Sequence, residues 1–398
     1  MTTKDRSGRA PAGRPWALRA LVLTLLLLVP ALALAACGSS DDDSSSSSAS
    51  TSAATGAATT ASEDGGGATA SGDWCGDKEI TLGIQDGGGL NGWSKESLKQ
   101  VELAARQCPN IKRTIVVNAG FDVQRAISGL NSLVAQGANA IVIIPDAGGP
   151  AELPGIRNAT RRGVKVVPWG SEPGGGSAGT DFVTYVDWDA RAAGSTWAEW
   201  IARQVGERGD VVFLGGPAGN AVDRDTLAGA LETFEQYPGM RMLTGDRPAV
   251  ANWDPAQTQK VTAGLLTQYP QIDGIIVADG QSAAGAIRAF EAAGRRVPPI
   301  ATLEANEVAC LWRRAGGERG GFPLATISAR NWLGRYAVRE AVAAVSEGDA
   351  GTADIVSLPL YEDSDGGKMP ECRPDAAPDS FFSNEASDAE LDRLMAEG

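Results

Sequence analysis

Side chains that can bind a small polar molecule follow the ends of successive strands that the pattern of this chain predicts. In open α/β sheets, ligands bind outside the carboxyl ends of the strands. Indole faces pack on C–H surfaces, whereas carboxylates, amides and a guanidinium pair with hydroxyl groups. Each such residue alone could be a helix cap or a solvated loop residue, so the prediction depends on their repetition. We predict a binding site for a polyhydroxylated small molecule that is built from Asp86, Asn91, Trp93, Asp146, Trp169, Asp187, Trp188, Asn220, Arg224, Trp253, Asp279, Gln281 and Glu304.

The loop after the first predicted strand has the glycine spacing of a nucleotide-binding turn. Gly87, Gly89 and Gly92 fit the pattern G-x-G-x-x-G. A dinucleotide site also needs an acidic residue at the end of the second strand, which here ends with Asn-Ala-Gly at 118–120. A phosphate loop needs a lysine at the position that Trp93 occupies. We therefore expect this loop to form one wall of a ligand cleft, and we predict no cofactor.

The chain contains no histidine. This excludes Ser-His-Asp and Cys-His nucleophilic sites and most zinc sites. The segment 175–179 fits the hydrolase pattern G-x-S-x-G, but it lacks the preceding strand, the following helix and the histidine base. We predict neither a metal site nor catalysis, and a carbohydrate-active enzyme that uses paired carboxylates such as Asp187 and Glu304 is the alternative.

The N-terminal 36 residues have the composition of an export signal. Five basic residues precede an apolar run from Ala20 to Ala36, which Pro30 interrupts and small residues end. A membrane-spanning anchor is the alternative, but it needs about 20 consecutive apolar residues. Leu34-Ala35-Ala36-Cys37 resembles the bacterial lipobox, which predicts a lipid on Cys37 and attachment to the outer face of the bacterial cytoplasmic membrane.

Residues 37–72 are predicted to form a disordered tether. They are almost all Ser, Ala, Thr, Gly and Asp, so they cannot bury enough apolar surface to fold. Without residues 1–36, the chain has 30 basic and 48 acidic residues and a formal net charge of −18. Such an acidic chain is a poor candidate for binding nucleic acid, and we expect contact with the membrane through the lipid alone.

Four cysteines follow Cys37, and an even number in an exported chain suggests disulfide bonds. We favour a bond between Cys75 and Cys108, because the first precedes the first strand and the second ends the first helix. Cys310 and Cys372 then form the second pair by elimination. Buried free thiols are the alternative.

After Trp74 the chain alternates between strands and helices with short connections. The run at 140–146 is apolar throughout, which is typical of a strand buried on both faces of a parallel sheet. The alternation starts again after Asp187, and two such series predict an α/β fold with two doubly wound lobes. The predicted strands are 78–86, 112–120, 140–146, 165–169, 181–187, 210–214, 272–278, 297–303, 324–329 and 355–360. The predicted helices include 225–237, 255–268, 282–293, 308–314 and 333–346, and the tail from about 362 is expected to be irregular apart from a short helix near 388.

Four motifs resemble those of a known family: AIVIIPDAG from 140, TYVDWDARAAG from 184, FLGGPAGNAVDRDTLAG from 213 and GIIVADGQSAAGAIRAFEAAG from 274. The chain resembles the type I solute-binding proteins of ABC importers, in particular the ribose-binding-like sugar group, over about residues 78 to 360. The resemblance implies two Rossmann-like lobes with parallel sheets and a three-stranded hinge. It places the crossings near 186–188, 303–305 and 348–354. The first lobe would then be 73–187 with 305–350, and the second lobe and tail 188–304 with 351–398.

The resemblance also implies roles for single residues. Arg224 is similar to the family's ligand-binding arginine, Asp187 to its aspartate near the first crossing, and Trp93 to the aromatic residue of the first loop. The family often has Asn-Asp where this chain has Asp279-Gly280, so either Asp279 or Gln281 could contact the ligand.

The implied function is a lipid-anchored, monomeric binding protein that captures a monosaccharide and delivers it to an ABC permease and its ATPase. The alternatives are a sensor or signal-molecule receptor on the same fold and, less favoured, a secreted carbohydrate-active enzyme.

Overall fold

The computed structural model describes residues 73–88, 91–352 and 354–383. All of them belong to one compact unit, residues 64–398. The expected signal peptide, lipid site at Cys37, tether and short helix near 388 lie outside the described residues. No helix of the described part is long and apolar enough to span a membrane.

The first lobe is built on a parallel sheet with the strand order β2-β1-β3-β4. Its third strand alternates between two apolar layers: Ala140 and Val142 join the cluster that includes α1, whereas Ile141 and Ile143 pack with α2 and α3. Burial on both faces therefore explains the unbroken apolar run at this position. The strands are β1 Ile80–Asp86, β2 Ile111–Asn118, β3 Ala140–Ile143 and β4 Lys165–Pro168, and the helices are α1 Gly92–Gln107, α2 Val123–Ala135, α3 Gly149–Arg161 and α9 Leu333–Ser346.

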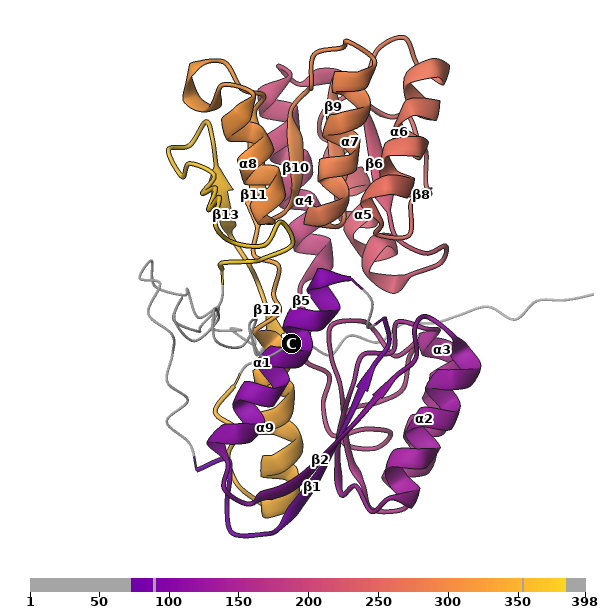
Figure 1. Ribbon diagram of the computed structural model, residues 1–398. Coiled ribbons are helices and arrows are strands. Elements are labelled where there is room, and N and C mark those ends of the chain that lie inside the picture. The colour runs from indigo at the N-terminus through magenta and orange to yellow at the C-terminus, as the bar shows by residue number, and fades with distance from the viewer. Residues whose placement is uncertain (1–72, 89–90, 353, 384–398) are drawn as a thin grey trace, which may run out of the picture. The chain divides into compact units, whose positions relative to one another are not determined.

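The second lobe is built on a larger sheet with the strand order β13-β11-β10-β9-β6-β7, in which β8 also pairs with β6. Helices α4 and α5 pack together, as do α6 and α7, and Figure 1 shows helices around the strands of this lobe. The strands are β6 Arg208–Gly215, β7 Gly239–Met242, β8 Ala249–Val250, β9 Gly274–Val277, β10 Ile300–Leu303, β11 Leu324–Ile327 and β13 Leu360–Asp363. The helices are α4 Ala190–Gln204, α5 Ala221–Phe234, α6 Pro255–Gln268, α7 Gly280–Ala292, α8 Asn306–Arg314 and the 3₁₀ turn Gly317–Arg319.

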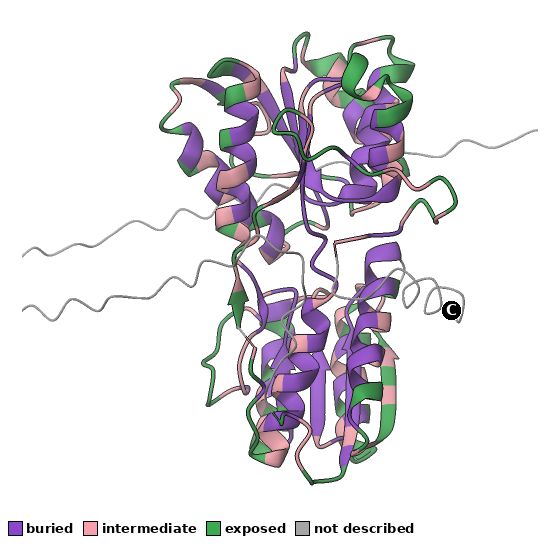
Figure 2. Ribbon diagram, turned by 90° about the vertical axis from the view of Figure 1, so that its left-hand side faces the viewer, coloured by how far each residue is buried: buried purple, intermediate pink, exposed green. Residues whose placement is uncertain are grey.

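Burial follows the position of each strand in its sheet. Every residue of β3, β9, β10 and β11 is buried, whereas the edge strand β2 is largely exposed. Figure 2 shows the buried strands enclosed by helices whose outer faces are exposed.

The segments between the lobes correct one prediction. Strands β5 (Asp187–Trp188) and β12 (Ile355–Val356) pair in parallel and give two of the expected crossings. The crossing expected near 303–305 is wrong, because β11 pairs with β10 throughout the second sheet, from Ile300 with Leu324 to Leu303 with Ile327. The chain crosses after β11, since the next helix, α9, packs on α1, β3 and β4 of the first lobe. The residues from 305 to the end of β11 thus lie with the second lobe, and the segment 328–332 makes the crossing.

Several predicted element bounds also differ. The strand predicted at 181–187 is reduced to β5, because the Asp181 carboxylate accepts hydrogen bonds from Arg157 and from the Ser177 backbone in a local turn. The strand predicted at 355–360 is divided into β12 and β13, and β13 runs antiparallel to β11. Helix α5 begins four residues earlier than predicted, because Asn220 caps it. The short strands β7 and β8 were not predicted.

Both favoured disulfide pairings are confirmed. Cys75 bonds to Cys108 across a Cα–Cα distance of 5.4 Å, and Cys310 bonds to Cys372 across 4.6 Å. The first bond joins the start of the first lobe to the end of α1. The second joins α8 to the segment that follows β13.

Candidate functional site

The first wall of the site is the start of helix α1. Asn91 caps this helix by accepting a hydrogen bond from the Ser94 backbone N–H at 2.9 Å. The indole N–H of Trp93 donates to the Ala329 carbonyl at 2.6 Å, and its ring centroid lies 6.0 Å from that of Trp169. Trp93 is therefore held from two sides, and one of the contacts comes from the segment that crosses between the lobes.

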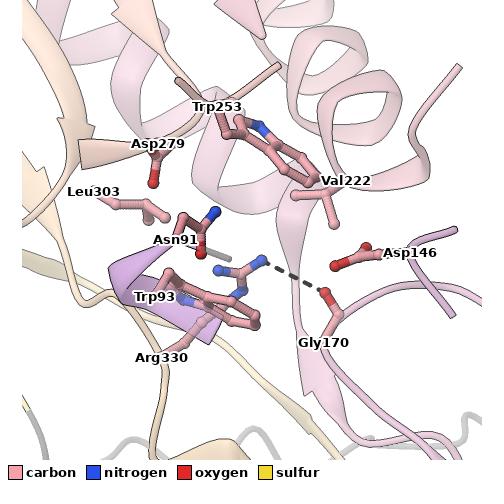
Figure 3. A pocket seen from close by; sticks show the side chains of 10 residues that line it. Asn91, Trp93, Asp146, Gly170, Val222, Trp253, Asp279, Leu303 and Arg330 are labelled. Carbon is pink, nitrogen blue, oxygen red and sulfur yellow. Dashed lines mark hydrogen bonds between the residues drawn. The ribbon is translucent and has the colours of Figure 1, made fainter. Parts of the chain in front are cut away.

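Arg330 is the main site residue that the sequence analysis missed. Its guanidinium lies 5.1 Å from the ring centroid of Trp93 and 4.6 Å from that of Trp188. Its terminal N–H donates to the Gly170 carbonyl at 3.5 Å, as Figure 3 shows, and its Nε lies 3.8 Å from Asp187 Oδ1. Only 6% of the residue is exposed, and its φ of +57° is unusual for a residue other than glycine. Arg330 is thus a buried cation stacked between indoles, in a backbone conformation that the surrounding packing must maintain.

The second wall comes from the loops that follow β8 and β9. Trp253 donates its indole N–H to Asp223 at 3.3 Å, and its ring lies against Gly216, where a Cβ would come within 2.1 Å of the ring. Only glycine fits at that position. Asp279 caps α7 by accepting hydrogen bonds from the Ser282 backbone N–H at 2.9 Å and the Ser282 hydroxyl at 2.8 Å.

These walls enclose a cavity to which both lobes contribute. The first lobe supplies Asn91, Trp93, Asp146 and Gly170, the second supplies Val222, Trp253, Ala278, Asp279 and Leu303, and the crossing segment supplies Arg330. Figure 3 shows the two indoles on either side of the space that Asn91 and the Arg330 guanidinium enter, with Asp279 and Asp146 at its edges. The structure thus brings together five of the predicted residues: Asn91, Trp93, Asp146, Trp253 and Asp279.

Other predicted residues support this cavity without lining it. Trp169 packs on Trp93, and Trp188 packs on Arg330. Asp187 accepts a hydrogen bond from the Tyr185 hydroxyl beside Arg330. Asn220 donates to Asp146 at 3.4 Å and so joins the two lobes, whereas Asp86 accepts from the Gly88 backbone N–H at 3.2 Å and shapes the first loop.

The structure places three predicted residues away from the cavity. The Arg224 side chain is 59% exposed and pairs with Asp225 at 2.8 Å and with Glu172 at 3.3 Å. Gln281 donates to the Asp379 carbonyl at 3.5 Å, so of the two candidates near α7 it is Asp279 that lines the cavity. Glu304 accepts backbone hydrogen bonds from the C-terminal segment.

Residues 88–349 match the periplasmic binding protein domain family. The chain belongs to this family. The two-lobed α/β fold predicted from the sequence is confirmed by its solved relatives.

This periplasmic binding protein shares low sequence identity with the relatives that follow. A xylitol-binding protein of Mycolicibacterium smegmatis is 27% identical over 194 residues, which are 48% of this chain and 52% of the relative. The chain therefore spans about half the length of the curated relatives it matches. A solute-binding protein of an Actinobacillus succinogenes ABC transporter, solved with bound D-allose, has a TM-score of 0.61 at 21% identity over 71% of this chain and 97% of its own. The fructose-binding periplasmic domain of a hybrid two-component system has a TM-score of 0.60 at 15% identity over 71% of this chain and 89% of its own.

The buried aspartates give the site of this periplasmic binding protein its electrostatic character. Burial raises the pKa of Asp187 to about 6, although the Arg330 charge and the Tyr185 hydrogen bond lower it. Burial likewise raises the pKa of Asp223 to about 7 and that of Asp279 to about 6, and it raises the pKa of Asp146. Of these residues, Asp146 and Asp279 line the cavity, and a carboxyl whose pKa is raised by burial can donate as well as accept a hydrogen bond.

The carboxylate pair of the enzyme alternative is not assembled in this periplasmic binding protein. Asp187 lies beside Arg330 at the hinge, whereas Glu304 contacts the C-terminal segment and does not line the cavity. Within the described ranges, no group of three or more Cys, Asp or Glu side chains could hold a metal ion.

Proposed function

We propose that this chain is an extracytoplasmic binding protein that captures a monosaccharide or a related polyhydroxylated molecule in the cavity between its lobes. The observation that supports this most strongly is the cavity itself, in which the indoles of Trp93 and Trp253 face one another across Asn91, Asp279 and Arg330. Apolar ring faces suit the C–H surfaces of a sugar, and the polar groups suit its hydroxyls. The names of the relatives, a xylitol-binding protein and a protein with bound D-allose, support the same ligand class.

Binding is expected to favour the form in which the lobes are closed. Groups from both lobes line the cavity, so a ligand can contact all of them only when the lobes are together. The Asn220–Asp146 hydrogen bond and the Arg224–Glu172 ion pair also join the two lobes. The ligand therefore shifts the population toward a closed protein, which is the form that a transporter could recognise.

We further propose that the protein delivers its ligand to an ABC transporter while it is attached to the membrane through Cys37. The family membership and the sequence of residues 1–37 support this. Cys37→Ser should move the mature protein from the detergent phase to the aqueous phase in a phase-separation assay. An unchanged distribution would count against the lipid anchor.

Sensing is the second candidate function. It is favoured by the likeness to the fructose-binding domain of a two-component system, which has the same fold. Deletion of the gene separates the two roles: a transport protein is needed for uptake of labelled ligand, whereas a sensor is needed only for the transcriptional response to it.

A panel of pentoses, hexoses and polyols tests the ligand class. A ligand present at 100 times its Kd should stabilise the folded chain by about 2.7 kcal/mol, which a thermal shift detects. The ligand should be recovered unchanged after incubation, because we propose binding without catalysis. If it is converted to a product, the enzyme alternative replaces this proposal.

A further inference from the structure

The C-terminal segment Cys372–Ser383, here called the clasp, is fixed to the second lobe. The disulfide bond of Cys372 with Cys310 ties its start to α8. The buried Asn306 side chain then donates to three clasp carbonyls, at 2.9 Å for Arg373, 3.2 Å for Ala376 and 3.0 Å for Ala377, and accepts from the Arg373 backbone N–H at 2.9 Å. One asparagine side chain therefore fixes the backbone of the clasp from Arg373 to Ala377.

The end of the clasp is held by the second lobe as well. The Glu304 carboxylate accepts hydrogen bonds from the Phe382 backbone N–H at 3.0 Å and the Ser383 backbone N–H at 2.9 Å. The backbone N–H groups of Asn306 and Glu307 donate to clasp carbonyls at 3.0 and 2.9 Å. The clasp must therefore move with the second lobe.

The same clasp contacts the first lobe at Glu96 of helix α1. The Phe381 backbone N–H donates to Glu96 Oε2 at 3.3 Å, and Phe381 and Glu96 are each only 2% exposed. The start of α1 also fits closely against this region, because a Cβ on Gly92 would come within 2.4 Å of Asp379 Oδ2. Within the described part of the chain, the other oxygen of Glu96, Oε1, is buried without a hydrogen-bond partner. Opening of the lobes would thus have to separate Glu96 from the clasp.

We propose that the clasp is a pH-sensitive latch that holds the two lobes together while Glu96 is protonated and releases them when Glu96 ionises. The proposal is independent of the ligand, because none of these contacts belongs to the cavity.

The groups that face Glu96 explain why its ionisation is unfavourable in the closed form. The pKa of Glu96 is raised to about 8, chiefly by burial and also by the Glu304 carboxylate and Asp379, while the Phe381 hydrogen bond lowers it. Glu304, whose own pKa burial raises to about 8, faces Glu362 of β13. Ionised Glu96 would therefore be a buried negative charge that faces carboxyl groups of the second lobe, which disfavours the closed form.

The direction of the pH effect follows from proton linkage. In the open form Glu96 is solvated and has an ordinary pKa near 4.5. Between that value and about 8 the closed form binds more protons than the open form, so rising pH favours opening. Each pH unit within this window can change the ratio of open to closed protein by up to about tenfold. Below the window and above it, Glu96 makes no further change.

The test measures lobe opening in the ligand-free protein by small-angle X-ray scattering between pH 5 and pH 9. The radius of gyration of the wild-type protein should increase with pH. Glu96→Gln keeps an oxygen that can accept from Phe381 but cannot ionise, so it should remove the part of this increase that Glu96 causes and leave the protein more closed than the wild type at high pH. Asp379→Asn removes a charge that faces Glu96 and so lowers the pKa of Glu96 in the closed form, which should make the increase smaller.

Glu152→Gln is the matched control. Glu152 is also buried, its pKa is raised by burial to about 7, and it bonds to Gln85 and the Gly148 backbone within the first lobe, away from the clasp. Its variant should open over the same pH range as the wild-type protein. The proposal is overturned if the wild-type protein does not open as pH rises, or if Glu96→Gln opens in the same way. Because no ligand is present, either result would leave the proposed sugar binding untouched.

Discussion

The Arg330 guanidinium lies 4.6 Å from the ring centroid of Trp188, so the crossing segment after β11 is stacked on hinge strand β5. The same guanidinium lies 5.1 Å from the ring centroid of Trp93. One cation therefore joins the hinge, the first wall of the cavity and the carboxylate of Asp187. This arrangement makes Arg330 the residue on which the proposed site depends most.

Substitution of Arg330 should weaken ligand binding more than substitution of Arg224. Arg330→Lys keeps the charge but loses the planar group that stacks on both indoles, so the Kd should rise about 5–30-fold, or about 1–2 kcal/mol. Arg224→Ala removes a cation in exposed ion pairs, which contribute about 0–1 kcal/mol. Calorimetric titration of both variants compares them. A larger loss for Arg224→Ala would favour the role that the family resemblance implies for that residue.

Gly216→Ala should disrupt the second wall. Its Cβ would lie 2.1 Å from the Trp253 ring, so the indole must move out of the cavity. We expect a loss of ligand affinity of at least about tenfold, because displacing an aromatic wall removes one side of the contact. Gly264→Ala is the control: it lies within α6 with nothing near its Cβ and should stabilise the helix by about 0.5–1 kcal/mol. Equal affinity of both variants and the wild-type protein would show that Trp253 does not contact the ligand.

Trp93→Phe should cost about 1–3 kcal/mol of stability. Phenylalanine keeps an aromatic ring beside Trp169 but cannot donate to the Ala329 carbonyl, which then loses this partner in a buried site. Urea denaturation measures the change. An unchanged midpoint would mean that the indole N–H contributes nothing to the connection between α1 and the crossing segment.

Stability should decrease as pH rises from about 5 to 8. The pKa values of Asp187, Asp223 and Asp279 are raised from 3.8 to about 6, 7 and 6, chiefly by burial. In this window the folded chain holds protons that the unfolded chain has released, so raising the pH favours unfolding. Below the ordinary pKa the contribution no longer changes. Urea titrations at pH 5 and pH 8 compare the free energies of unfolding, and a higher value at pH 8 would contradict these assignments.

The disulfide bond between Cys75 and Cys108 should stabilise the first lobe by about 3–4 kcal/mol, given the 33-residue separation. The double variant Cys75→Ser/Cys108→Ser, or treatment with a reductant, should lower the Tm. A Tm that does not respond to either change would indicate that the bond does not form in the native protein.

The elements with strong local signals could be predicted from the sequence. The apolar runs of β3 and β9 lie where the pattern placed them. The strand predicted at 181–187 failed because its polar residues bond within a local turn. The Asp181 carboxylate also accepts a hydrogen bond from Arg157 of α3, and hydrophobic periodicity contains no information on such a tertiary contact.

The site residues were predicted in part, for related reasons. Arg330 follows the carboxyl end of β11, which is the same kind of position that predicted the other site residues. The sequence therefore contained a signal for it. Arg224 was selected both by its position after a predicted strand and by the family resemblance, and its exposure could not be predicted because it depends on where α5 begins. Glu304 directly follows a predicted strand, but its carboxylate binds the clasp, whose sequence has no repeating pattern.

Native mass spectrometry of the protein purified from its own cells tests the central claim most directly. We predict one bound small molecule per chain with the mass of a pentose, hexose or polyol, which Arg330→Ala no longer retains. A bound molecule of another class, such as an amino acid, a peptide or a nucleotide, would contradict the proposed function.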